Sequence, residues 1–100
     1  MIKTRITQIC SNIRNINITN LYVNYTKDIN YMKAFGKHLR KCRKLKGITQ
    51  EQLSDLTSLA VSQIGRIERG EINTSISHIK LIADKLELQP YDLFKFNYGK

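Results

Sequence analysis

The sequence predicts an all-α protein, and three observations indicate it. Apolar residues recur at spacings of three and four through residues 32–97, the pattern of helices with one buried face. Capping residues and helix breakers, including Gly47, Gly70 and Pro90, separate these segments. The 100 residues suffice for one small domain with a modest core, but not for two. We therefore expect five short helices and no sheet in residues 32–97.

Residues 1–31 differ in composition from this domain. They contain no Ala, Gly, Pro or Glu and are rich in Ile, Asn and Thr. Some isoleucines fall on one helix face, namely Ile2, Ile6, Ile9, Ile13 and Ile16, whereas residues 16–25 partly alternate as a strand would. The intervening Asn, Thr and Ser are poor helix formers. We interpret residues 1–31 as a leader, disordered or weakly structured, and Met32 as an alternative start.

The first helix of the domain is predicted from Met32 or Lys33 to Lys46. Phe35, Leu39 and Cys42 form its apolar face, and Cys42 is interpreted as a small buried hydrophobe. The net charge of +9 is concentrated in this helix, which has no acid. Its basic residues are Lys33, Lys37, Arg40, Lys41, Arg43, Lys44 and Lys46. Such a basic element on a small domain is typical of proteins that bind a polyanion.

Residues 49–70 are predicted to form two short helices joined by a tight turn. Thr49 and Gln52 have the spacing of a capping box at the first helix, and residues 57–59 form the turn. The second helix runs from Val61 to Arg69, is polar and cationic on its outer side, and ends at Gly70. This arrangement predicts a DNA-binding helix-turn-helix.

The same stretch resembles the Cro/CI-type (XRE-type) helix-turn-helix family of phage and bacterial regulators. The matching parts are Gly36–Leu39–Arg43, residues 47–53 (GITQEQL), residues 62–70 (SQIGRIERG), residues 81–86 and Leu93–Phe94. The resemblance extends from about Phe35 to Phe96 and implies a five-helix, lambda-repressor-like bundle. Where the family usually has Gly, this chain has Ser58, so we expect a different or strained backbone there. Ala60 replaces the usual Ser or Thr cap.

The resemblance also implies which residues meet DNA. Base-reading positions are matched by Val61, Ser62 and Arg66, and Gln63 can reach bases or phosphate. Arg66 can bond guanine in the bidentate manner, and Val61 can touch a thymine methyl group. The predicted phosphate contacts are Gln50, Arg43, Lys44, Arg69, Asn73 and Thr74. Arg43 is further implied to form a structural ion pair with Glu68.

The last part of the domain holds two further predicted helices. Ser75 caps the fourth, whose core residues are Ile76, Ile79, Leu81, Ile82 and Leu86. Pro90 starts the fifth, where Leu93, Phe94 and Phe96 give more apolar surface than so short a helix needs. Part of that surface is predicted to be a dimer interface. The whole core is predicted to contain Phe35, Leu39, Leu53, Leu56, Ile64, Ile67, Ile79, Ile82, Leu86 and Leu93.

No pattern in the sequence indicates catalysis, a metal or a cofactor. His38 and His78 lack partners at ligand spacing and are interpreted as surface residues, and Cys10 and Cys42 are too few for a metal site or a disulfide framework. Neither a signal peptide nor a membrane span is visible, so we expect a cytoplasmic, nucleoid-associated protein.

Two functions follow from these patterns. The preferred one is a dimeric repressor or autoregulator that binds double-stranded DNA at a two-fold symmetric operator. The alternative is a protein-interaction module, the antitoxin partner of a toxin, in which the leader folds against that partner.

Overall fold

The computed structural model describes residues 27–98, and the predictions made for residues 1–26 lie outside that range. The described chain contains the α-helices α3 (Ile29–Leu45), α4 (Gln50–Thr57), α5 (Val61–Glu68) and α6 (Ile76–Lys85), and the 3-10 helix η2 (Pro90–Phe94). No strand occurs between residues 27 and 98, and the all-helical class is confirmed. The prediction of five α-helices is wrong for the last element, which is a single 3-10 segment.

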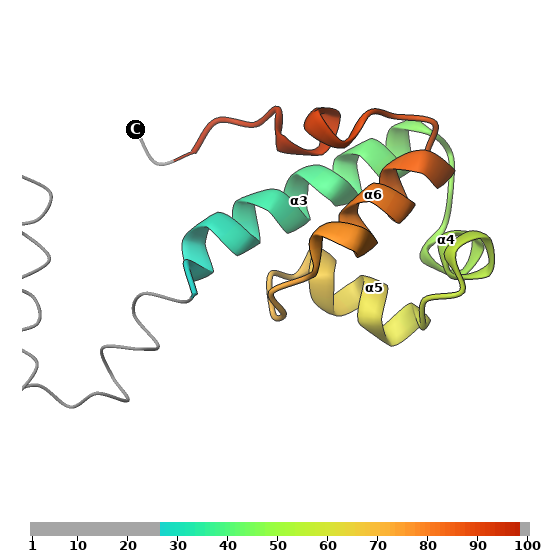
Figure 1. The fold of residues 1–100 in the computed structure, drawn as a ribbon, viewed down its shortest axis with the longest axis horizontal. Helices are drawn as coiled ribbons and strands as arrows, with labels where there is room; N and C mark the ends of the chain where they lie inside the picture. Colours follow the sequence, from blue (N-terminus) through green and yellow to red (C-terminus); the bar gives the residue numbers. More distant parts are fainter. Residues whose placement is uncertain (1–26, 99–100) are drawn as a thin grey trace, which may run out of the picture.

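The elements form a bundle around α3, the longest of the described helices (Figure 1). α3 packs against α5 on one side and against η2 on another, while α4 packs against α5 and α6. After η2 the chain runs back along α3 toward the beginning of that helix (Figure 1). α5 therefore lies at one edge of the domain, supported by α3 and α4.

Side-chain caps start α4 and α6 where the sequence predicts them. In the capping box of α4, the Thr49 hydroxyl accepts from Gln52 N at 3.0 Å, and Thr49 N donates to Gln52 Oε1 at 2.8 Å. The Ser75 hydroxyl accepts from His78 N at the start of α6. Ala60 gives α5 no side-chain cap. Ser58 has φ 63°, so the turn keeps the left-handed backbone that glycine adopts more easily.

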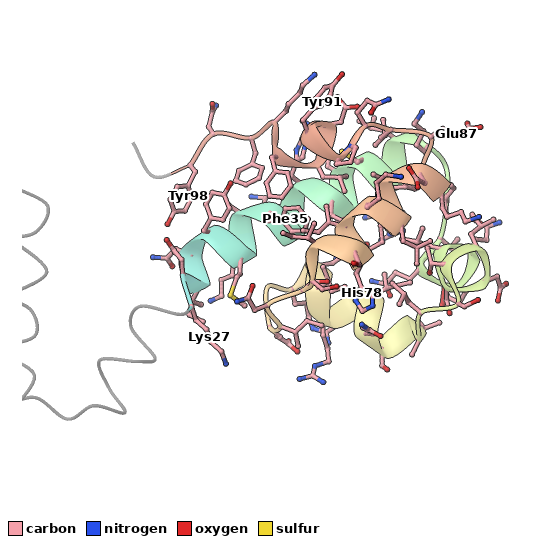
Figure 2. All side chains as sticks on the ribbon, in the orientation of Figure 1. Lys27, Phe35, His78, Glu87, Tyr91 and Tyr98 are labelled. Carbon is pink, nitrogen blue, oxygen red and sulfur yellow. The ribbon has the colours of Figure 1, made fainter. Side chains whose placement is uncertain are left out.

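The first helix begins earlier than the sequence predicted. Asp28 is its N-cap and accepts from Tyr31 N at 3.0 Å, so α3 starts at Ile29 rather than Met32. The beginning of α3 also meets the C-terminal segment. Tyr98 lies beside the beginning of α3 (Figure 2), and its hydroxyl is 2.9 Å from an Asp28 carboxylate oxygen. Tyr31 contacts the rings of Phe96 and Tyr98. Residues 28–31 consequently belong to the folded domain and not to the leader.

Within residues 27–98, nine apolar residues form the buried core, and most of them were predicted from the sequence. They are Phe35, Leu39, Leu53, Ile64, Ile67, Ile82, Ala83, Leu86 and Leu93. Leu56 and Ile76 were predicted to lie in the core, and this prediction is wrong, because the two residues are 46% and 85% exposed. In α4 the inward position after Leu53 is four residues on, at Thr57, whose buried hydroxyl donates to Leu53 O. Leu93 is fully buried and cannot belong to an interface.

Gly36 permits the close approach of α3 and α5. A Cβ atom at this position would collide with the backbone carbonyl groups of Ile67 and Glu68. Any larger residue must therefore push the two helices apart. The close contact fixes α5 against α3 and sets the direction in which its outer side faces.

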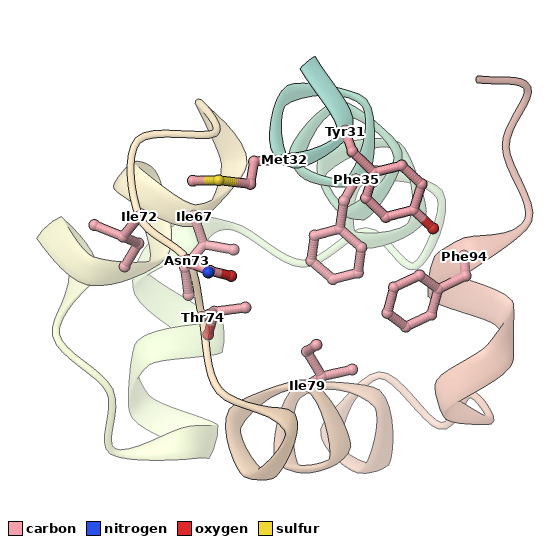
Figure 3. Close-up of a pocket in the computed structure, with 9 residues that line it drawn as sticks. All are labelled: Tyr31, Met32, Phe35, Ile67, Ile72, Asn73, Thr74, Ile79 and Phe94. Carbon is pink, nitrogen blue, oxygen red and sulfur yellow. The ribbon is translucent and has the colours of Figure 1, made fainter. Parts of the chain in front are cut away.

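A small apolar cavity lies between α3, η2 and the segment that joins α5 to α6 (Figure 3). Its volume is about 90 Å³, far below the several hundred Å³ of ordinary small-molecule sites. Its lining residues are Tyr31, Met32, Phe35, Ile67, Ile72, Asn73, Thr74, Ile79 and Phe94.

His38 on α3 is partly buried and its Nε2 lies 2.9 Å from Asp92 O, so the prediction of a surface histidine is wrong.

Candidate DNA-binding site

The outer side of α5 presents a short row of polar and cationic residues. Ser62, Arg66 and Arg69 are exposed, whereas Ile64 and Ile67 point into the core. Val61 stands at the start of the helix and is 36% exposed. A helix with one side anchored and the other carrying hydrogen-bonding groups can enter a major groove. The helix predicted to read DNA has the necessary exposure.

A buried ion pair connects α5 to α3. Arg43 donates from Nε to Glu68 Oε2 at 2.6 Å and from Nη2 to Glu68 Oε1 at 3.0 Å. Its Nη1 donates to Ile48 O at 2.8 Å. The exposed fractions of the two side chains are 7% for Arg43 and 1% for Glu68. This bidentate, enclosed pair fixes the end of α5 to the basic helix.

Gln50 and Arg69 both place a side-chain nitrogen close to Gly65. Gln50 Nε2 donates to Glu68 Oε1 at 2.9 Å, which places this amide at the N-terminus of α4 and beside α5. A Cβ atom on Gly65 would lie 3.0 Å from Arg69 Nη1 and 3.8 Å from Gln50 Nε2. The small residue at position 65 therefore leaves room for two predicted phosphate-binding side chains from different helices. The positive end of the α4 dipole suits the same phosphate chemistry.

Glu71 stands among the arginines at the end of α5. Arg69 Nε is 2.7 Å and Arg69 Nη2 is 3.3 Å from the Glu71 carboxylate, and Arg66 Nε is 3.9 Å from it. All three side chains are about half exposed. The hydrogen bond from Arg69 lowers the pKa of Glu71 and raises the pKa of Arg69. Sequence reasoning missed Glu71, although an acid two residues after Arg69 was the available signal.

The exposed cations of α3 continue the positive surface. Gly36, Arg40 and Lys44 are spaced by four and lie along one side of the helix, the side on which Gly36 meets α5. Arg40 and Lys44 line a shallow surface together with Lys37, Lys41 and Leu45. Within residues 27–98, none of these exposed lysines and arginines of α3 forms an ion pair. Arg40 and Lys44 are therefore available to a polyanion that lies across α5 and α3.

Three predicted contact residues are placed differently by the structure. Arg43 is enclosed with each of its nitrogen groups bonded to the protein, so we retain only its structural role. Gln63 Nε2 lies 3.3 Å from His78 Nδ1, because its position on α5 faces α6 and not the outer side. The Thr74 hydroxyl is buried and has no hydrogen-bond partner among the described residues. Asn73 remains exposed.

Nothing in residues 27–98 suggests metal or membrane chemistry. No group of three potential metal ligands occurs in this range. None of the helices described there is long and apolar enough to cross a bilayer. Cys42 is partly buried, and burial raises the pKa of its thiol.

The fold and this surface define the class of the protein, a helix-turn-helix protein of the DNA-binding type. The comparison with protein families agrees, since the helix-turn-helix family model matches residues 39–93. The chain belongs to this family, and the resemblance to Cro/CI-type (XRE-type) regulators is confirmed. The family is one of DNA-binding transcriptional regulators and not of enzymes.

Individual relatives point the same way. The chain is 39% identical over 61 residues to the uncharacterized HTH-type transcriptional regulator YazB of Bacillus subtilis (strain 168), covering 61% of this chain and 88% of YazB. It is similar in structure to the restriction-modification controller protein C.AhdI from Aeromonas hydrophila. That match has 40% identity and a TM-score of 0.62, and it covers 63% of this chain and 96% of C.AhdI.

A second controller protein was solved with DNA. C.Esp1396I, as a tetramer in complex with its natural 35 base-pair operator, is 31% identical to the chain with a TM-score of 0.59. The match covers 65% of this chain and 86% of C.Esp1396I. These relatives are regulators and controllers, and they do not favour the antitoxin alternative.

Proposed function

We propose that the protein is a sequence-specific regulator of transcription that places α5 in the major groove of double-stranded DNA. The observation that carries this proposal is the exposed row of Ser62, Arg66 and Arg69 on a helix fixed from behind by the Arg43–Glu68 pair. The fixed support orients the side chains before DNA arrives, which reduces the entropy lost on binding.

In the proposed complex, Val61, Ser62 and Arg66 meet base edges. Gln50, Arg69, Lys44 and Asn73 meet phosphates on either side of the groove. Phosphate contacts set the position of the protein, and base contacts set its preference for sequence. The exposed cations of α3 add non-specific attraction.

We further propose that two copies act together as a repressor or autoregulator. The C.Esp1396I tetramer on its operator supports assembly on DNA by this class of protein. On the chain itself, Phe94 and Tyr91 are exposed apolar residues at η2, with exposed fractions of 40% and 61%. Two reading helices related by a two-fold axis would fit half-sites about 34 Å apart. Such a regulator acts at the nucleoid, in the cytoplasm.

The test compares an operator with random DNA. An operator is selected from a pool of random duplexes, and binding to it and to a random duplex is measured by fluorescence anisotropy. Arg66→Ala is expected to cost about 1–3 kcal/mol on the operator and little on random DNA, because one bidentate base contact is lost. An equal loss on both duplexes would show that Arg66 binds phosphate instead.

A further inference from the structure

We infer that Glu71 is an internal competitor of DNA: its carboxylate occupies the Arg69 guanidinium that a phosphate must capture, and so limits affinity for every sequence. The inference rests on the proposed function, since it concerns the same surface. It assigns a regulatory role to an acidic residue of a surface that is otherwise basic.

The geometry of the carboxylate is that of a bound oxyanion. Arg69 presents Nε and Nη2 to the two oxygen atoms of Glu71, at 2.7 and 3.3 Å. A guanidinium binds a phosphate through the same pair of parallel N–H groups. A DNA phosphate that binds Arg69 through Nε and Nη2 requires the face that Glu71 occupies, and both cannot hold that face at once.

The backbone holds Glu71 in this position. Glu71 N donates to Arg66 O at 2.8 Å and Gly70 N donates to Ile67 O at 3.0 Å, the paired bonds that close a helix with a left-handed glycine. Gly70 has φ 71°, and a Cβ atom there would also collide with the backbone of Lys33. The carboxylate is thus attached to the end of α5 and remains beside the arginines.

The competition is weak enough for DNA to win. The side chains of Arg69 and Glu71 are 56% and 47% exposed, and ion pairs of such exposure contribute little to folding. The competition for Arg69 opposes binding, and it does not depend on the base sequence. Glu71 should therefore set the level of affinity and leave base preference unchanged.

The experiment measures binding of Glu71→Gln to the selected operator and to a random duplex over a series of salt concentrations. Asp84→Asn is the matched control, because it removes the same charge from an exposed pair with Lys80 on α6. Glu71→Gln is expected to bind both duplexes roughly 3- to 10-fold more tightly than Asp84→Asn near 0.1 M salt. The slope of log affinity against log salt should steepen by about 0.9.

A mutant cycle tests whether the effect passes through Arg69. In an Arg69→Gln background, Glu71→Gln should give no gain beyond that of Asp84→Asn. A gain that persists there would mean direct repulsion of DNA by Glu71, and it would overturn the inference. So would Glu71→Gln binding that equals or falls below that of the control. If the wild-type protein binds no duplex, the proposed function itself fails, which is a separate result.

Discussion

At the scale of single residues, the Arg43–Glu68 pair is the feature on which the site depends most. Arg43→Ala leaves the Glu68 carboxylate enclosed, with Gln50 as its remaining hydrogen-bond donor among the described residues. Removing one partner of a buried pair costs about 3–5 kcal/mol of the free energy of unfolding. Urea denaturation of the variant should show this loss together with weaker DNA binding. Lys44→Ala, one residue on and exposed, should lose less than about 0.5 kcal/mol. Similar losses in the two variants would contradict a structural role for the pair.

Lys44 tests the phosphate side of the site. Lys44→Ala should weaken binding to operator and random duplexes by the same factor, because phosphates are present in both. The slope of log affinity against log salt should become shallower by roughly 0.9, as one fewer counterion is released. A salt titration checks this. An unchanged slope would place Lys44 outside the DNA contact.

For Thr74 the sequence and the structure lead to different expectations: the sequence predicts a phosphate contact, whereas the structure encloses the hydroxyl. Its hydroxyl is buried without a partner in the described chain, and such a group costs about 1–3 kcal/mol. Thr74→Val should therefore raise the free energy of unfolding by about 1 kcal/mol in urea titration and leave operator affinity unchanged. Weaker operator binding would instead support the phosphate contact that the sequence predicted for Thr74.

At the scale of elements, the sequence predicted helices better than their ends and partners. The capping box at Thr49 and the glycine end at Gly70 are local signals, and both are confirmed. The start of α3 was missed, since Asp28 stands within a stretch of leader-like composition and its partner Tyr98 is 70 residues away. Leu56 was misplaced because an eight-residue helix has too few turns to define its inward side from spacing alone.

In the candidate site, too, some features could be predicted from the sequence and others depend on how the helices pack. Exposure of Ser62 and Arg66 follows from helical period, and the Arg43–Glu68 pair followed from the family resemblance. The contact between Gln63 and His78 depends on how α6 crosses α5, which no local pattern encodes. The same is true of the placement of Gln50 and Arg69 beside Gly65.

The beginning of α3 provides the prediction at this scale. A chain that starts at residue 32 loses the Asp28 cap, its bond to Tyr98 and the ring contacts of Tyr31. A lost N-cap alone costs about 1 kcal/mol. We expect this chain to melt several degrees below one that starts at residue 27, measured by circular dichroism. Equal melting temperatures would show that the contacts of Asp28 and Tyr31 with the C-terminal segment add no stability and that the domain starts at Met32 after all.

At the scale of the whole molecule, the domain combines a tightly packed apolar core with a cationic surface on α3 and α5. The proposed dimer would join two such domains through the exposed residues of η2. Phe94→Ala should raise the dimer dissociation constant at least tenfold in sedimentation equilibrium, because an apolar contact is removed from both copies. Leu45→Ala, which changes a residue that is 77% exposed at the end of α3, is the control. If both variants dimerise as the wild type does, the interface lies elsewhere.

The central claim is that α5 reads a DNA sequence through its outer side. Parallel selections from one pool of random duplexes, with the wild-type protein and with Arg66→Ala, test it most directly. The wild type should enrich two related half-sites about one helical turn apart. Arg66→Ala should enrich the same motif with the preference relaxed at one base pair in each half-site. The claim would be contradicted if the wild-type protein enriched no motif. It would also be contradicted if the wild-type protein and Arg66→Ala enriched the same motif with the same base preferences.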